Sequence, residues 1–123
     1  MVEFSGLRVL LVEDEGGVAL LLESMLEDLG CDVAASVARL SRAFEALERQ
    51  AFDLAVLDVN LAGETSFELA RRLREEGTPL VFSTGYGPSG MPDDLGSCVV
   101  LPKPFTQTGL RQAIVDCMDP TRA

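Results

Sequence analysis

An uninterrupted apolar run that ends in a carboxylate constrains this chain more than any other feature. Residues Leu54 to Leu57 are all apolar, and Asp58 follows them directly. Apolar character without alternation predicts a strand that is buried on both faces, as in a parallel sheet covered by helices. In such sheets, ligands and chemistry gather just beyond the carboxyl ends of the strands, where Asp58 would lie. Taken alone, the stretch fits an ordinary turn aspartate equally well.

Four further runs have a similar apolar character and alternate with helical patterns. The expected strands comprise the Leu54 run and residues 7–12, 31–35, 79–84 and 97–101. Apolar residues at helical spacing predict helices over residues 17–29, 40–47, 66–76 and 106–118. Ser36 or Ser41 is the expected cap of the second helix.

This alternation of strands and helices predicts the fold class. Repeated βαβ units form a parallel sheet with helices on both faces. Right-handed crossovers leave few topologies, and we expect a flavodoxin-like, doubly wound, five-stranded sheet of order 2-1-3-4-5. A loop is expected over Leu61–Thr65. The glycines and prolines between Gly85 and Gly96 permit one short helical turn at most, so we expect a reduced or mobile fourth helix.

Length, charge and composition limit the function classes. A chain of 123 residues suits one domain, 1–123, with its core over about 7–118. A net charge of −10 repels phosphate backbones, so we expect no nucleic-acid partner. No apolar run approaches the ~20 residues that span a bilayer, and we find no signal-peptide pattern. We therefore expect no membrane partner and a cytoplasmic location; the opening Met1 and the short tail favour a complete protein.

The residue types that are missing exclude several kinds of site. The chain has no histidine, and its 3 cysteines lack CxxC spacing. An ordinary zinc site and a histidine-activated nucleophile are therefore excluded. Any catalysis must use carboxylates, hydroxyls, lysine or a hard metal ion.

Polar side chains follow four of the five expected strands. Glu13 and Asp14 follow the first strand, Asp58 the third, Thr84 the fourth and Lys103 the fifth. These strands are neighbours in the predicted order, so the groups should converge at one edge of the sheet. Three carboxylates together repel one another, which favours a raised pKa or a bound cation. Magnesium is the natural candidate because it prefers oxygen ligands and leaves room for water and a phosphate.

Each of these residues also has a plainer interpretation. The acidic cluster that begins at Glu13 fits a solvated turn. Thr84 fits a strand-end hydroxyl that bonds its own backbone, and Lys103 fits an exposed surface lysine. Convergence of all four strand ends is what favours a functional site.

The combination resembles the receiver domain of bacterial two-component response regulators. The resemblance lies in the acidic pair Glu13–Asp14, in Asp58, in Thr84 and in Lys103–Pro104, and it covers about residues 7–118. It implies that Asp58 accepts a phosphoryl group from a phosphohistidine. The donor would be a sensor histidine kinase or a histidine phosphotransfer protein.

The resemblance also implies roles for the other residues. Mg2+ would be the cofactor, held by Glu13, Asp14, Asp58 and the backbone carbonyl of Asn60. Thr84 would hydrogen-bond the phosphoryl oxygens, and Lys103 would pair with them as a point charge. The peptide bond between Lys103 and Pro104 is expected to be cis.

The chain departs from the receiver pattern at several positions. Val100 stands where receivers usually have an aromatic residue that moves with the threonine. Ala62–Gly63 replaces the common Pro-Gly. Phe82–Tyr86 (Phe-Ser-Thr-Gly-Tyr) resembles a subgroup of mostly stand-alone receivers with a Phe-Ala-Thr-Gly-Tyr-like motif, in which the fourth helix is reduced or mobile. Tyr86 fits either a substitute switch residue or simple packing.

We therefore expect a phosphorylation-dependent signalling switch and not an enzyme that turns over an external substrate. It would act by contacts with an unknown downstream protein, without an output domain in this chain. One alternative is a small phosphatase or phosphotransferase that forms an aspartyl phosphate. Haloacid-dehalogenase-like enzymes of this type want an aspartate two residues after the nucleophile, where the chain has Asn60. The other alternative, a receiver-like scaffold that is never phosphorylated, conflicts with the intact set of site residues.

Overall fold

The computed structural model describes residues 4–85 and 90–119, and its centre is a five-stranded parallel sheet. The strand order is β2-β1-β3-β6-β7, which in chain order is 2-1-3-4-5. The predicted flavodoxin-like topology is therefore confirmed. The strands are β1 (Arg8–Val12), β2 (Asp32–Val37), β3 (Leu54–Asp58), β6 (Leu80–Thr84) and β7 (Val99–Pro102).

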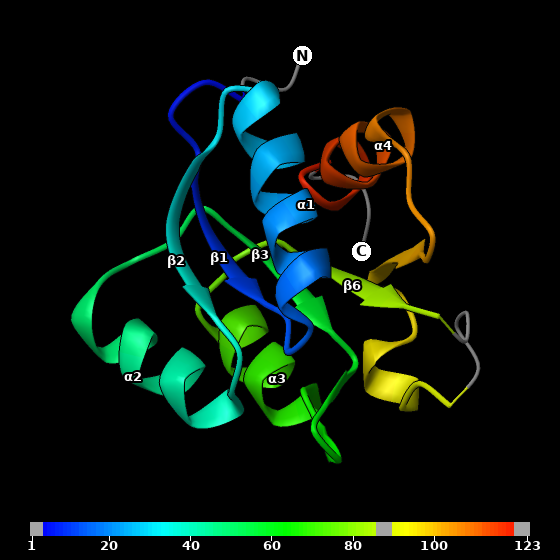
Figure 1. The fold of residues 1–123 in the computed structure, drawn as a ribbon. Helices are drawn as coiled ribbons and strands as arrows, with labels where there is room; N and C mark the ends of the chain where they lie inside the picture. Colours follow the sequence, from blue (N-terminus) through cyan, green and yellow to red (C-terminus); the bar gives the residue numbers. More distant parts are fainter. Residues whose placement is uncertain (1–3, 86–89, 120–123) are drawn as a thin grey trace.

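Helices cover both faces of this sheet (Figure 1). The α1 helix (Gly16–Asp28) and the α4 helix (Gln107–Cys117) pack on one face, and α2 (Leu40–Arg49) and α3 (Phe67–Glu75) pack on the other. Residues 54–57 of β3 enter the two separate apolar clusters in alternation, and all four are fully buried. This double burial explains why the run has no polar alternation.

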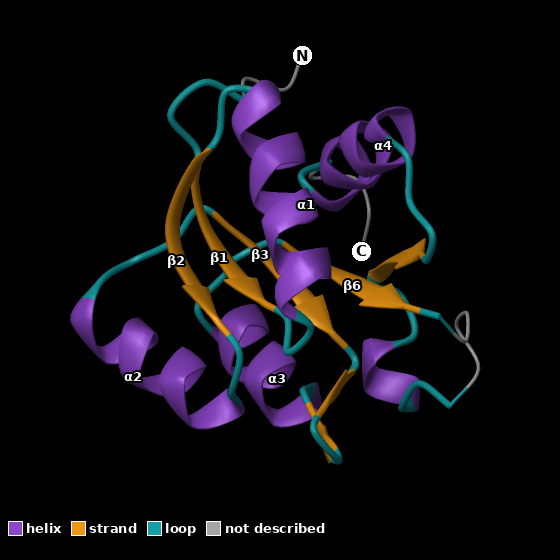
Figure 2. Ribbon diagram, in the orientation of Figure 1, coloured by secondary structure: helices purple, strands orange, loops and turns teal. Residues whose placement is uncertain are grey.

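A short β-hairpin lies where the sequence predicted a loop. Strands β4 (Asn60–Leu61) and β5 (Glu64–Thr65) pair antiparallel just beyond the end of β3 (Figure 2). Ala62 and Gly63 both have positive φ, 51° and 90°, as the two central residues of a type I′ hairpin turn require. The loop prediction was wrong because Ala62 gives no sequence signal for a left-handed backbone.

The connection between β6 and β7 contains a single short helix in its described part. This is the 3-10 helix η1 (Asp93–Leu95), in agreement with a reduced fourth helix. Leu95 is fully buried in the cluster beneath α3, and Arg71 donates two hydrogen bonds to the Asp94 carboxylate, of 2.9 and 3.2 Å. Residues 86–89 lie outside the described part of the chain, so the prediction about Tyr86 is not addressed.

The cap of α2 differs from the sequence prediction. Neither Ser36 nor Ser41 caps α2, because its N-cap is Arg39 and Ser36 instead donates a hydrogen bond to Glu23. Within the two described ranges, no helix has the length and apolar character needed to cross a membrane.

Candidate functional site

The predicted site residues meet at the carboxyl edge of the sheet. Glu13 directly follows β1, Asp58 ends β3, Thr84 ends β6, and Lys103 directly follows β7. The backbone N–H of Lys103 donates to the Thr84 carbonyl over 2.9 Å, which joins the last two strand ends. The peptide bond between Lys103 and Pro104 is cis, as expected.

Three carboxylates gather at this edge. One oxygen from each of Glu13, Asp14 and Asp58 lies within 4.8 Å of the other two. Glu13 is 2% exposed and Asp58 is 9% exposed, whereas Asp14 faces solvent. A cavity of about 460 Å³ opens beside them, and its lining includes Asp14, Asp58, Asn60, Thr84 and Lys103.

The Lys103 ammonium is the cation of this cluster. Its Nζ lies 3.2 Å from Glu13 Oε1 and 3.2 Å from Asp58 Oδ2. Partial burial lowers the pKa of Lys103, but the charges of Asp58 and Glu13 outweigh that effect and raise the pKa overall. Lys103 therefore stays protonated at neutral pH and is held against the Asp58 carboxylate. This contact does not fit an exposed surface lysine.

Glu13 carries the strongest electrostatic conflict in the site. Burial and, to a smaller extent, the Asp58 charge raise its pKa, the Glu15 N–H and Lys103 lower it, and the net result is a pKa of about 6. Its Oε2 accepts a hydrogen bond from the Glu15 N–H over 3.1 Å. Its Oε1 is buried, and among the described residues its polar partner is the Lys103 ammonium at 3.2 Å, which Asp58 shares.

These features fit a hard divalent cation. The donor set is made of carboxylate oxygens, one of which is buried and has only the ammonium that it shares with Asp58 as a partner among the described residues. A cation such as Mg2+ would satisfy that oxygen and neutralise the repulsion among the three carboxylates. The pKa of Glu13 is raised although Lys103 and the Glu15 N–H lower it, so these groups offset the cost of the buried charge only in part.

The hairpin beyond β3 holds two of the acidic residues. The Ala62 N–H donates to Asp14 Oδ2 over 3.0 Å, and the Asn60 N–H donates to Asp58 Oδ1 over 3.3 Å. The Asn60 side chain accepts from the Gly63 N–H over 3.1 Å, so it serves the hairpin turn. Asn60 lines the site cavity, and the use of its carbonyl as a metal ligand stays a prediction.

Sequence reasoning missed Ser66. It placed this residue at the start of a helix, but the Ser66 hydroxyl is fully buried and donates to the Asp58 carbonyl over 2.6 Å. A serine before a helix normally indicates a cap, so the sequence offers no signal for this contact.

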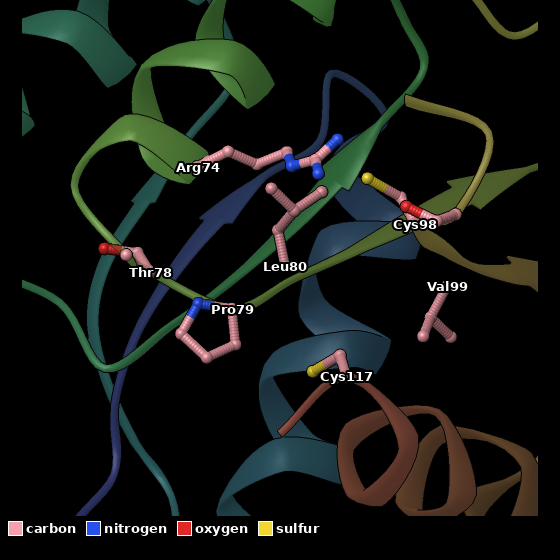
Figure 3. A pocket seen from close by; sticks show the side chains of 9 residues that line it. Arg74, Thr78, Pro79, Leu80, Cys98, Val99 and Cys117 are labelled. Atoms are coloured by element: carbon pink, nitrogen blue, oxygen red, sulfur yellow. The ribbon is translucent and has the colours of Figure 1, made fainter. Parts of the chain in front are cut away.

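A second cavity, of about 230 Å³, lies at the opposite edge of the sheet (Figure 3). It is formed where β6 and β7 begin, and its lining includes Arg74, Cys98 and Cys117. Arg74 donates to the Asp94 carbonyl, and burial raises the pKa of the Cys98 thiol. The Arg74 guanidinium is thus engaged and the Cys98 thiol is protonated, so this cavity lacks the convergent charges of the carboxyl edge.

Comparison with known proteins places the chain in a family. Residues 9–115 match the response regulator receiver domain. This chain belongs to that family. Receiver domains act as signalling switches in two-component systems, bind Mg2+ at an acidic pocket, and interact with histidine kinases or phosphotransfer proteins.

Individual relatives agree with this assignment. The chain is 31% identical over 115 residues to the sensory transduction protein LytT of Bacillus subtilis, covering 88% of the chain and 46% of LytT. The solution structure of SdrG from Sphingomonas melonis Fr1 is 33% identical with a TM-score of 0.80, covering 93% of this receiver domain and 97% of SdrG. The BeF3-activated conformation of SdrG, from Pseudomonas melonis Fr1, is 35% identical with a TM-score of 0.77. The match covers 90% of this chain and 96% of that SdrG chain. This chain spans less than half the length of the curated relatives it matches.

Proposed function

We propose that residues 1–123 form a single receiver domain, with its core over about 7–118, that is switched by phosphorylation of Asp58. The observation that carries this proposal is the Lys103 ammonium, which lies 3.2 Å from the carboxylates of both Asp58 and Glu13. A protonated amine at that position neutralises charge where phosphoryl oxygens would gather. The family membership of the chain supports the same chemistry.

The transfer is a displacement at phosphorus. A carboxylate oxygen of Asp58 forms the new O–P bond while the P–N bond of a phosphohistidine breaks. The imidazole nitrogen keeps the electron pair of the broken bond and takes up a proton. Lys103 then pairs with a phosphoryl oxygen as a point charge, and the Thr84 hydroxyl donates one hydrogen bond to another. The chain turns over no external substrate beyond its own phosphorylation and dephosphorylation.

Glu13, Asp14, Asp58 and the Asn60 carbonyl are the proposed ligands of Mg2+. When bound, this ion supplies positive charge beside the transferred phosphoryl group. The convergence of three carboxylates and the buried Oε1 of Glu13 support this assignment.

The proposed donor is a sensor histidine kinase or a histidine phosphotransfer protein, and the recipient of the signal is a downstream protein. Leu20 and Leu21 are 68% and 51% exposed on α1, which begins directly beyond the acidic cluster. An exposed apolar pair on this helix offers a surface that a partner protein could cover. The cytoplasmic location expected from the sequence stays a prediction.

We further propose that the segment from Gly85 to Gly96 reads the phosphorylation state. Of its described residues, 85 and 90–96, only Asp93–Leu95 are helical, and an exposed ion pair between Asp94 and Arg71 fastens them to α3. Few backbone hydrogen bonds must break to move such a segment. Val100 has no aromatic ring whose movement could follow that of Thr84, so another element must respond to phosphorylation. Slow amide exchange in 90–96 that a phosphoryl mimic with Mg2+ leaves unchanged would contradict this role.

The alternative phosphatase function lacks its acid–base group. Such enzymes want an aspartate two residues after the nucleophile, and the side chain of Asn60 is occupied by the hairpin turn. No described contact of Asn60 favours proton transfer.

The proposed function is tested with acetyl phosphate and Mg2+. Intact-protein mass spectrometry should show the gain of one phosphoryl group in the wild type and none in Asp58→Asn, which keeps the size of the side chain but is no nucleophile. A gain that persists in Asp58→Asn contradicts the assignment of the acceptor. No gain in the wild type favours the unphosphorylated scaffold.

A further inference from the structure

Ser66 places a fully buried hydroxyl against the backbone of the proposed phosphoryl acceptor. Its side chain is 0% exposed, and its Oγ donates a hydrogen bond to the carbonyl oxygen of Asp58 over 2.6 Å. The Oγ also lies 3.4 Å from the Val59 carbonyl oxygen, which accepts from the Ser66 N–H over 2.9 Å. One residue thus holds two successive carbonyls at the point where β3 ends.

This contact replaces a helix cap. Ser66 is the N-cap of α3, where a serine side chain usually accepts a hydrogen bond from an N–H of the first helical turn. The Ser66 side chain makes no such bond. Its hydroxyl points instead to the end of β3, while its backbone carbonyl accepts from the Ala70 N–H over 3.0 Å as the helix begins. The hydroxyl therefore serves the acceptor strand and not the helix.

The orientation of the Asp58 carboxylate depends on the backbone that Ser66 fixes. Oδ1 accepts from the Asn60 N–H over 3.3 Å, and Oδ2 accepts from Lys103 Nζ over 3.2 Å. The Asn60 N–H belongs to the peptide that joins Val59 to Asn60, and the Val59 carbonyl of this peptide accepts from both the N–H and the hydroxyl of Ser66. Rotation of that peptide would move the N–H away from Oδ1 and turn Oδ2 relative to Lys103. Phosphoryl transfer depends on such positioning.

We propose that Ser66 is a positioning residue for phosphoryl transfer to Asp58, acting through its hydrogen bond to the Asp58 carbonyl. This inference rests on the proposed function, because it presupposes that Asp58 is the acceptor. Ser66 takes no part in bond making, since the O–P bond forms at Asp58 and the bond that breaks belongs to the donor. Loss of its hydroxyl therefore lowers the maximal rate of phosphorylation and leaves the apparent affinity for the phosphoryl donor unchanged.

The test compares Ser66→Ala with the wild type in the initial rate of phosphorylation by acetyl phosphate at saturating Mg2+. We expect the maximal rate to fall about tenfold and the half-saturating acetyl phosphate concentration to stay within about twofold. Ser83→Ala is the matched control. Ser83 is equally buried on the neighbouring strand β6, and its hydroxyl has no hydrogen-bond partner among the described residues. The Ser83→Ala variant should be phosphorylated at the wild-type rate.

Two further variants separate positioning from stability. Ile114→Val removes one fully buried methylene from α4, which lowers stability without touching the site. It should keep the wild-type rate. Ser66→Cys keeps a side chain of similar size with a weak donor, so it should show the loss of rate even where the alanine variant does not fold.

The outcomes distinguish this inference from the proposed function. A phosphorylated wild type whose rate is matched by the Ser66 variants overturns the role of Ser66 and leaves the function intact. Equal slowing in Ile114→Val also overturns it, because stability alone then sets the rate. A wild type that takes up no phosphoryl group contradicts the proposed function, and the role of Ser66 falls with it.

Discussion

At the residue scale, burial and the neighbouring Asp58 charge both raise the pKa of the Glu13 carboxyl. Its pKa is about 6 in the folded chain, against 4.5 for the unperturbed group, with burial as the largest cause. The folded state therefore binds this proton more tightly than the unfolded state. The resulting stability is fully present below pH 4.5 and is lost as the pH rises through about 6.

We predict that Glu13→Gln removes this pH dependence. The difference in free energy of unfolding, wild type minus variant, should fall by roughly 1–2 kcal/mol between pH 4.5 and 7 in the absence of divalent cations. Urea denaturation at several pH values with EDTA measures it. Glu15→Gln, at an exposed neighbouring carboxylate, controls for the loss of charge. A difference that stays flat across this window would show that Glu13 titrates normally.

Residues at the strand ends were predictable, whereas Ser66 was not. Asp58, Glu13 and Lys103 follow apolar runs, and parallel strands necessarily end at the same edge of the sheet. Ser66 acts on Asp58 only because α3 starts directly beneath the end of β3. That proximity is a tertiary fact, and local propensity predicts a cap there instead.

At the element scale, η1 is held by tertiary contacts. It has three residues, Asp93–Leu95, too few for a regular helix to stabilise itself. Leu95 is fully buried, and Asp94 forms an exposed pair with Arg71. Burial of the leucine should therefore outweigh the ion pair, because exposed pairs contribute little.

We predict that Leu95→Ala lowers the free energy of unfolding by about 2–4 kcal/mol, through a lost transfer energy and a residual cavity. Asp94→Asn should have a clearly smaller effect, and it serves as the paired comparison on the same element. Chemical denaturation of both variants measures the ranking. The opposite ranking would mean that η1 is held by charge and not by packing.

The helices were predictable to within a few residues from their apolar period and the sheet strands from their apolar runs, but the hairpin β4–β5 was not. Its turn needs two residues with positive φ, and one of them is Ala62. The hydrogen bond from the Ala62 N–H to the Asp14 carboxylate holds this turn in place, and it is a tertiary contact. Gly63 alone signalled a turn without fixing its type.

At the scale of the whole molecule, topology followed from the alternation of elements and the right-handed crossover rule. The chain carries a net charge of −10, and three carboxylates meet at one edge of its sheet. Self-repulsion of this kind opposes the compact state until a cation is bound. Cation binding and fold stability are therefore coupled.

We predict that Mg2+ raises the melting temperature of the wild type. At a Mg2+ concentration about 100 times its Kd, the added stability is about 2.7 kcal/mol. Asp14→Ala should lose most of the rise, since Asp14 is a proposed ligand that faces the site cavity. Thermal melts at constant ionic strength, with KCl replacing MgCl2, separate specific binding from screening. A rise that survives in Asp14→Ala would contradict the metal assignment.

The central claim is that Asp58 is the phosphoryl acceptor, and chemical trapping tests it most directly. Borohydride reduces an aspartyl phosphate to homoserine, which peptide mass spectrometry locates by position. After incubation with acetyl phosphate and Mg2+, we predict homoserine at position 58 and at no other aspartate, with none formed when EDTA replaces Mg2+. Homoserine at another position, or a phosphorylated protein that yields none at position 58, would contradict the account.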